Sequence, residues 1–390
     1  MKKIIILFFA ILCLNLDAII VSQINVFGNY YTQKQTILDF IYLKKNKNYS
    51  EEEFDYYKNL SLQFLKDSDF FDKVEIKCHN SENTKIVNVY VKEGHLWKIG
   101  ANLHSVMVGR NNLFGKGYNF RIRVGEEQTL SFYKAYVSGM SVAISYKKIS
   151  KRYESENNFW EDYKYRIFKS SLSYLFRLNE FYALKWTYFR NNNFFNNWQV
   201  NLLTDISTHP SSIENGYISE FLIDTRDSKK TPTNGFYVQF GDELIYPYKK
   251  NIYFLDSYNY FKVTKQFYLM AHFSAKQIDK KLPQYYWQNL DSIFLYHFFN
   301  INKKLYKSYW GINFEPRLRW YENDYYFLEN KLFYDFCYSS EIKNKYKIKY
   351  SAIGTGMRLH IKKYFVTDVS LDISHCTNEF SVYWKIGKRW

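Results

Sequence analysis

Much of the chain alternates bulky apolar and polar residues one by one, which is the pattern of extended strands with two unlike faces. In FSVYWKI the residues of one side are apolar: Phe380, Val382, Trp384 and Ile386. The segments SGMSVAISYKK (138–148) and YFVTDVSLDIS (364–374) alternate in the same way. The pattern predicts β-strands with one apolar and one polar face.

From residue 97 to the C-terminus such segments recur without a convincing long helix, and we count about 16 of them. The predicted strands are 97–107, 118–125, 128–137, 140–149, 164–175, 180–190, 215–225, 235–244, 252–263, 266–278, 287–299, 311–322, 330–341, 346–360, 363–374 and 380–390. A soluble sandwich buries the apolar face, whereas a transmembrane barrel turns that face outward and keeps a polar lumen. Alternation alone fits both architectures.

The first 18 residues, MKKIIILFFAILCLNLDA, predict a signal peptide. Lys2 and Lys3 form a basic start, an apolar run follows, and Ala18 suits cleavage. The alternative is an uncleaved anchor. After Ala18 we find no apolar run of about 20 residues, so only a closed barrel could span a bilayer.

Composition favours the membrane reading. The chain holds 39 Tyr, 34 Phe and 9 Trp, and belts of Tyr and Trp mark membrane interfaces. The net charge of +16 is spread along the chain rather than gathered in one stripe. We recognise no nucleic-acid-binding module, so we expect no nucleic acid among the partners.

Cleavage after Ala18 would leave three cysteines, Cys78, Cys337 and Cys376. An odd number excludes a fully paired disulfide framework. A bridge between Cys337 and Cys376 and buried free thiols are the two alternatives, and we favour the thiols.

The segment 19–94 predicts a small α+β domain with the order strand, helix, helix, strand, strand. Thr32 with Gln35 and Ser50 with Glu53 form two capping boxes, which predict the starts of helices through about residues 43 and 66. Two extended segments follow, FFDKVEIKC and KIVNVYVKE, joined by the polar turn HNSENT.

This order resembles a POTRA domain, the periplasmic module that precedes the barrels of BamA-like outer-membrane insertases. After the predicted signal peptide (1–18), the resemblance implies a POTRA-like periplasmic domain (19–94) and an outer-membrane β-barrel of about 16 antiparallel strands (95–390). In that family the module binds extended client segments along a sheet edge, by strand addition.

Two motifs inside the predicted barrel fit the same family. NLFGKG (112–117) resembles the junction after its first barrel strand. DTRDSKKTPTNG (224–235) resembles its mid-barrel turn, and the matching residues are Asp224, Arg226, Asp227, Pro232, Thr233 and Gly235. Charged side chains at a strand end can cross-link a turn whose geometry Pro and Gly set, so we expect a structural role rather than catalysis.

The C-terminus supplies a further match. Ile386, Gly387 and Trp390 resemble the closing strand and the terminal aromatic signal by which newly made barrels are recognised for assembly. Trp390 stands in place of the commoner Phe.

In this family an inner loop ends in an Arg-Gly-aromatic tip, whose Arg pairs with acids on the barrel wall. LRWY (318–321) would place Arg319 at that tip, with Trp320 replacing the Gly. Alternatively, NFEPR (313–317) resembles the strand that follows the loop.

The second register keeps every spacing, and we prefer it. It places Glu315, Arg317 and Asp335 on the wall as ion-pair candidates. It also leaves the loop tip near 292–298, where there is no Arg. In that case the lock on the inner loop is altered, which puts full insertase or transport activity in doubt.

We find no hydrolytic or metal-binding constellation, so we expect no enzyme activity, no metal and no cofactor. The resemblance implies an outer-membrane assembly factor that captures unfolded barrel proteins and templates their insertion. The alternatives are a dedicated two-partner-type secretion pore and a porin or structural barrel that has lost the activity. The implied partners are unfolded outer-membrane or secreted clients, outer-membrane lipid, and periplasmic or lipoprotein accessory subunits.

Overall fold

The computed structural model describes residues 19–81, 84–101, 105–125, 127–134, 138–154, 160–195, 211–229, 231–279, 281–282, 306–323, 326–341, 347–361, 367–376 and 379–386. The chain forms two compact units. One ends at Leu96 and also includes the turn Asn112–Gly117, and the other comprises Trp97–Asn111 and the chain from Tyr118 onward.

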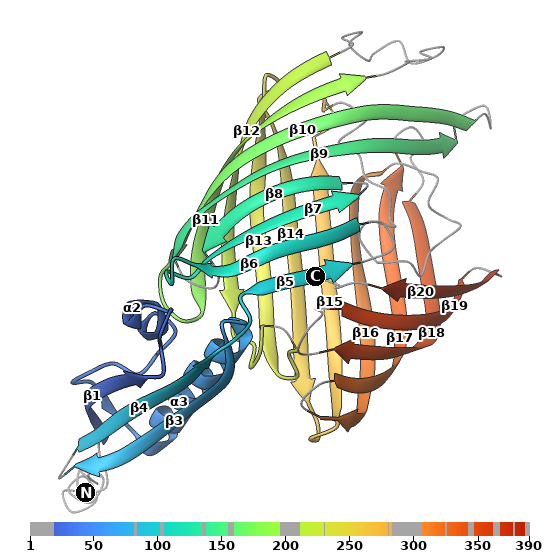
Figure 1. Ribbon diagram of the computed structural model, residues 1–390. Helices are drawn as coiled ribbons and strands as arrows, with labels where there is room; N and C mark the ends of the chain where they lie inside the picture. Colours follow the sequence, from blue (N-terminus) through green and yellow to red (C-terminus); the bar gives the residue numbers. More distant parts are fainter. Residues whose placement is uncertain are drawn as a thin grey trace, which may run out of the picture. The chain divides into compact units, whose positions relative to one another are not determined.

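The N-terminal unit is a mixed sheet with two helices (Figure 1). Its elements are β1 (Ile19–Phe27), α2 (Lys34–Leu38), β2 (Asn48–Tyr49), α3 (Glu51–Asp67), β3 (Phe71–Ser81) and β4 (Thr84–Glu93). The strand order is β2-β1-β4-β3, with β1 parallel to β4 and the other pairs antiparallel. The 11-residue strand β3 therefore forms one edge of this sheet.

Helix α3 confirms one of the two predicted capping boxes. The Ser50 hydroxyl accepts the Glu53 amide at 3.2 Å, and the Glu53 carboxylate accepts the Ser50 amide at 3.2 Å. Phe54, Phe64 and Leu65 of this helix are buried, as the helical spacing of the apolar residues requires.

The other predicted capping box is wrong. Helix α2 begins at Lys34 and ends at Leu38, and its N-cap residue is Gln33. The Thr32 hydroxyl instead donates to Glu93 at 2.9 Å and accepts from Asn112 at 2.7 Å. Thr32, predicted to cap the helix, is thus bound by residues distant in sequence. The helix also ends at Leu38, earlier than predicted. The HNSENT turn is also shorter than expected, because β3 continues to Ser81.

The second unit is a sheet of 16 strands in which each strand lies beside its neighbours in sequence. The strands are β5 (Trp97–Ala101), β6 (Ser105–Leu113), β7 (Tyr118–Gly125), β8 (Glu127–Lys134), β9 (Gly139–Glu154), β10 (Trp160–Arg177), β11 (Tyr182–Phe195), β12 (Ser211–Asp224), β13 (Gly235–Tyr246), β14 (Lys250–Lys262), β15 (Phe267–Ile278), β16 (Tyr306–Glu322), β17 (Tyr326–Glu341), β18 (Lys347–Ile361), β19 (Thr367–Cys376) and β20 (Glu379–Ile386). Figure 1 shows this sheet curling round, with β5 and β20 as its two end strands.

Two predicted strands differ from this arrangement. The predicted strand 97–107 is two strands, β5 and β6, which pair with each other from Trp97↔Arg110 to Ala101↔Val106. The predicted strand 287–299 lies outside the described residues.

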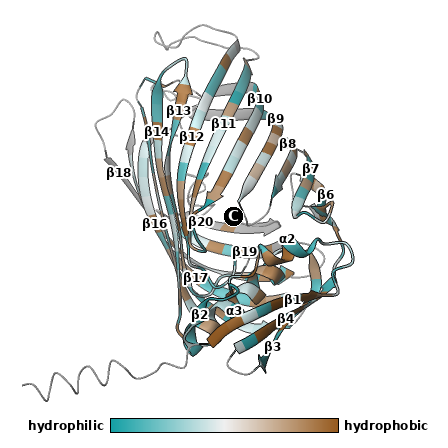
Figure 2. Ribbon diagram, turned by 90° about the vertical axis from the view of Figure 1, so that its left-hand side faces the viewer, coloured by the Kyte–Doolittle hydropathy of each residue, from teal (hydrophilic) through white to brown (hydrophobic). Residues whose placement is uncertain are grey.

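The two faces of the sheet decide between sandwich and barrel. Buried polar residues share one face, including Glu214, Glu220, Glu315, Arg317, Glu329 and Asp335. The opposite face exposes large apolar residues such as Leu332, Ile353 and Val382, at 61%, 60% and 65%. The alternation is visible as bands along the strands in Figure 2. A polar inner face with an apolar outer face is the arrangement of a transmembrane barrel, so the sandwich is excluded.

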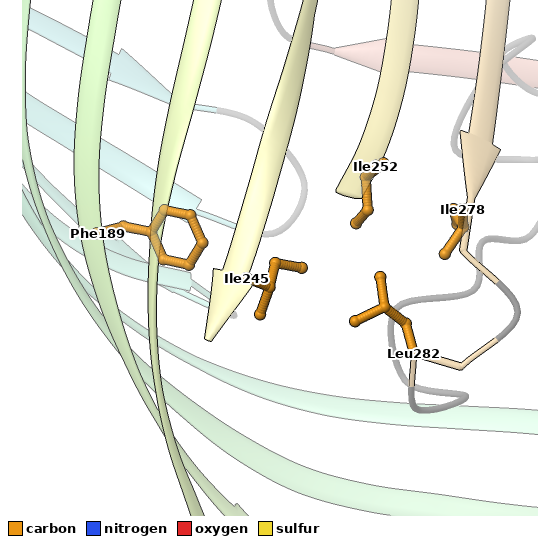
Figure 3. Close-up of a cluster of buried hydrophobic side chains, with 5 residues drawn as sticks. All are labelled: Phe189, Ile245, Ile252, Ile278 and Leu282. Atoms are coloured by element: carbon orange, nitrogen blue, oxygen red, sulfur yellow. The ribbon is translucent and has the colours of Figure 1, made fainter. Parts of the chain in front are cut away.

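An apolar cluster interrupts the polar inner face. It comprises Phe189, Ile245, Ile252, Ile278 and Leu282. Figure 3 shows Leu282, from the connection after β15, directed at the isoleucines of β13, β14 and β15. The start of this connection is therefore packed against the inner wall, and its Asp279 amide donates to the Asn251 carbonyl at 3.3 Å.

Cys337 is a buried free thiol, and Cys78 is a half-buried free thiol. The predicted alternative of a Cys337–Cys376 bridge is therefore wrong. Neither helix of the described residues, α2 or α3, is long and apolar enough to cross a membrane.

Candidate functional site

The inner face of β16 carries a run of polar side chains at every second position: Asn313, Glu315, Arg317 and Arg319. The two-residue period of a strand places all four on one side. Strand β17 places polar residues beside them, in the pairs Asn313↔Asp335, Arg317↔Lys331 and Arg319↔Glu329.

Glu329 is the centre of the resulting charged cluster. Its carboxylate lies 3.4 Å from Arg317 Nη1, 3.8 Å from Arg319 Nη2 and 3.8 Å from Arg358 Nη1. It also accepts the Tyr268 hydroxyl. Glu329 is only 1% exposed, and its carboxylate lies close to three guanidinium groups. These cations compensate its buried negative charge.

The cluster continues along the wall to β19. Arg317 Nε donates to Glu315 at 2.9 Å. Lys331 Nζ lies 3.0 Å from Asp372 and 3.9 Å from Glu315. Glu315 is fully buried, and such a charge persists only where partners and hydrogen bonds replace water.

The structure places the four predicted wall residues as follows. Glu315 and Arg317 contact each other directly, and Arg319 joins them through Glu329. Asp335 is fully buried and accepts the Asn313 side-chain amide. Arg319 lies within β16 rather than at a loop tip, so the LRWY register is wrong. The alternative loop tip, 292–298, lies outside the described residues.

Sequence reasoning missed half of the cluster: Glu329, Lys331, Arg358 and Asp372. The spacing of Glu329 and Lys331 places both on the face of Asp335, which was the available signal. The contribution of β18 and β19 depends on strand register, which one sequence does not specify.

The connection between β12 and β13 forms a cross-linked turn. Arg226 donates to both carboxylate oxygens of Asp224, at 2.8 and 2.9 Å. Lys229 Nζ lies 2.7 Å from Asp224. Asp227 accepts the amides of Ser228 and Thr233, each at 2.9 Å. Burial lowers the pKa of Lys229 to about 8, although Asp224 acts in the opposite direction.

Gly235, at the end of this turn, leaves no room for a larger residue. Its φ is +94°, and a Cβ atom would lie 2.4 Å from the Thr225 carbonyl oxygen. We expect Gly235→Ala to lower the free energy of unfolding by more than about 1 kcal/mol. The measurement is the urea midpoint of the protein in lipid vesicles. Gly100→Ala, whose Cβ would meet only Met107 Cε at 3.3 Å, is the control, and equal shifts would contradict the prediction.

Of the predicted closing-strand residues, Ile386 is the last residue of β20 and pairs with Val369. Gly387 and Trp390 lie outside the described residues. Pro232 lies in the β12–β13 connection and lines a cavity on the inner face.

The chain combines a small α/β domain with a 16-stranded antiparallel sheet whose inner face is charged and whose outer face is apolar, the architecture of a transmembrane β-barrel. Residues 19–94 match the POTRA family model, described as surface antigen variable number repeat. The segment that precedes the 16-stranded sheet thus matches a POTRA domain.

The chain also resembles solved structures of other proteins. BamA from Haemophilus ducreyi lacking POTRA domains 1–3 is 12% identical with a TM-score of 0.56, over 94% of this chain and 84% of that chain. CdiB from Escherichia coli is 10% identical with a TM-score of 0.65, over 94% and 76%. CdiB from Acinetobacter baumannii is 8% identical with a TM-score of 0.55, over 95% and 74%.

None of the curated proteins matches the sequence. The resemblance to BamA-like barrels predicted from the sequence is confirmed at the level of fold, and the POTRA domain is confirmed by its family model.

Proposed function

We propose that this protein is an outer-membrane assembly factor that captures unfolded barrel proteins and templates their insertion. The observation that carries the proposal is a POTRA domain with a long edge strand, β3, in the same chain as a BamA-like barrel. An edge strand presents unpaired backbone groups that can pair with an added strand.

The exposed side chains of β3 suit a reversible docking edge. Glu75 lies 2.7 Å from Lys73 and 3.5 Å from Lys77. Charges of this kind oppose uncontrolled edge-to-edge aggregation, while the backbone stays available to an unfolded client.

We place the barrel in the bacterial outer membrane and the POTRA domain in the periplasm, with residues 1–18 as a signal peptide. The apolar outer face supports contact with lipid. After capture, the end strands β5 and β20 would part laterally, and the exposed edges would template the strands of the client. Gly387 would weaken pairing near this seam, because glycine is poor in strands. Periplasmic or lipoprotein accessory subunits are the further partners we propose.

A dedicated secretion pore is the second candidate. The charged inner face favours it, because an extended substrate passing through a lumen would meet polar groups rather than lipid. A structural barrel without either activity is the third.

Quantitative outer-membrane proteomics after depletion of the protein in its own host tests these candidates. We expect many unrelated barrel proteins to decrease. Loss of one secreted or surface protein would instead support the dedicated pore. No change in any other protein would contradict both and leave the structural barrel.

Strand addition predicts where a client should crosslink. A photo-crosslinking residue at Lys77, which is exposed on the edge strand β3, should give several-fold more client adduct than one at Lys92 on the interior strand β4. Both side chains are exposed, so the comparison isolates the edge. Equal yields at the two positions would contradict capture at β3.

A further inference from the structure

A cavity of about 430 Å³ lies on the inner face, between the β12–β13 connection and the wall formed by β13 to β18. Aromatic side chains from four strands line it, among them Tyr237, Tyr258, Tyr268 and Phe327. Cavities of this size accept small ligands or side chains.

The described lining contains five cationic side chains and one carboxylate. The cations are Arg226, Lys229, Arg317, Arg319 and Arg358. The carboxylate is Asp256, which lies 2.6 Å from His272 Nε2. The acids that balance the cations, Asp224, Glu315 and Glu329, are outside this lining, so the cavity itself faces mostly positive groups.

Arg319 is positioned to bind a ligand there. Its guanidinium carbon lies over the Phe327 ring, 4.1 Å from the ring centre, so a cation–π contact helps to fix the group. Its Nε is buried and has no hydrogen-bond partner among the described residues. A buried donor without a partner costs about 1–3 kcal/mol, which a ligand acceptor would recover.

Asn313 supplies the complementary group. Its Oδ1 is likewise buried without a hydrogen-bond partner in the described part of the chain, while its amide nitrogen donates to Asp335. The cavity therefore offers a free donor on Arg319 and a free acceptor on Asn313. A peptide group next to a carboxylate side chain satisfies both, and the aromatic lining accommodates the aliphatic part of the side chain.

We propose that this cavity binds an acidic residue of an extended polypeptide, with its carboxylate at Arg319 and its backbone amide at Asn313. The inference rests on the proposed function, because it assigns the client a chemical class. The location on the inner face favours a polypeptide over a lipid headgroup, since lipid lies against the opposite face.

Binding of fluorescent peptides to the purified full-length protein in detergent micelles tests the site. We expect a Glu-containing peptide to bind at least about tenfold more tightly than its Gln counterpart, the difference that one charge-assisted hydrogen bond supplies. Arg319→Gln should remove this preference. Lys229→Gln, in the turn, should reduce it and serves as a second variant if Arg319→Gln folds poorly. Lys185→Gln is the control, because Lys185 pairs with buried Glu220 at 2.6 Å on the inner face outside this cavity.

Equal binding of the Glu and Gln peptides would overturn the proposal. So would displacement by inorganic phosphate in the absence of any peptide preference, which would identify a phosphate or lipid-headgroup site instead. This outcome is separable from the assembly function. Loss of many barrel proteins on depletion, without a peptide preference, would reject the site and retain the proposed function.

The Glu preference should also weaken with rising pH. Lys229 has a pKa of about 8, and the charged groups around it are Asp224, Arg226 and Arg177. Above that pH the amine loses its proton, so the cavity has one cation fewer. We expect weaker binding of the Glu peptide at pH 9 than at pH 7, with the Gln peptide unchanged. The pH dependence should disappear in Lys229→Gln, and its persistence would exclude Lys229 as the cause.

Discussion

Glu329→Gln is expected to destabilise the barrel by about 3–5 kcal/mol, because it breaks a buried ion-pair network by removing one partner. Three guanidinium groups, from Arg317, Arg319 and Arg358, then face one another without the carboxylate between them. Glutamine retains the shape and can still accept the Tyr268 hydroxyl, so the effect reports charge.

The measurement is urea unfolding of the protein reconstituted in lipid vesicles, followed by tryptophan fluorescence. Glu322→Gln is the matched control, since Glu322 pairs with Arg319 at 3.2 Å but its side chain is 45% exposed. Exposed pairs contribute at most about 1 kcal/mol. If both variants shift the unfolding free energy equally, the cluster does not stabilise the wall through charge.

Ile144→Arg is expected to lower the free energy of unfolding by about 2–4 kcal/mol, the effect of a cation on the lipid face near the bilayer midplane. Ile144 lies on the outer face of β9 and is 39% exposed. Ser145→Arg on the same strand points to the inner face, where water and polar groups can solvate the guanidinium, so we expect less than half of that effect.

The pair is compared by heat-modifiability on gels and by the same urea titration. Neighbouring positions share strand propensity and depth, which leaves the face as the variable. A larger penalty at Ser145 than at Ile144 would reverse our assignment of the lipid-facing side.

Local patterns predicted the faces of the strands well, because a two-residue period depends only on the chain itself. The same reasoning found Glu315 and Arg317, which share a strand. It merged β5 and β6 into one strand, since the short stretch between them carries no strong turn signal. It also missed Arg358 and Asp372, which reach the cluster only through the registers of β17, β18 and β19.

The N-terminal domain shows the same limit on a smaller scale. Ser50 and Glu53 cap α3 through contacts three residues apart, so the sequence alone revealed them. Thr32 satisfies the same local rule, but Glu93 and Asn112 engage its hydroxyl from far along the chain. A local motif is thus decisive only where no distant partner competes for the same side chain.

The simple strand order of the barrel has a kinetic consequence. Every strand from β5 to β20 pairs with its neighbour in the chain, so most pairings close a short loop and carry a small entropic cost. The sheet can therefore grow hairpin by hairpin from either end. The pairing of β15 with β16 spans the longest connection of the sheet, from Ile278 to Tyr306, and we expect it to be the slowest step in the folding of this protein.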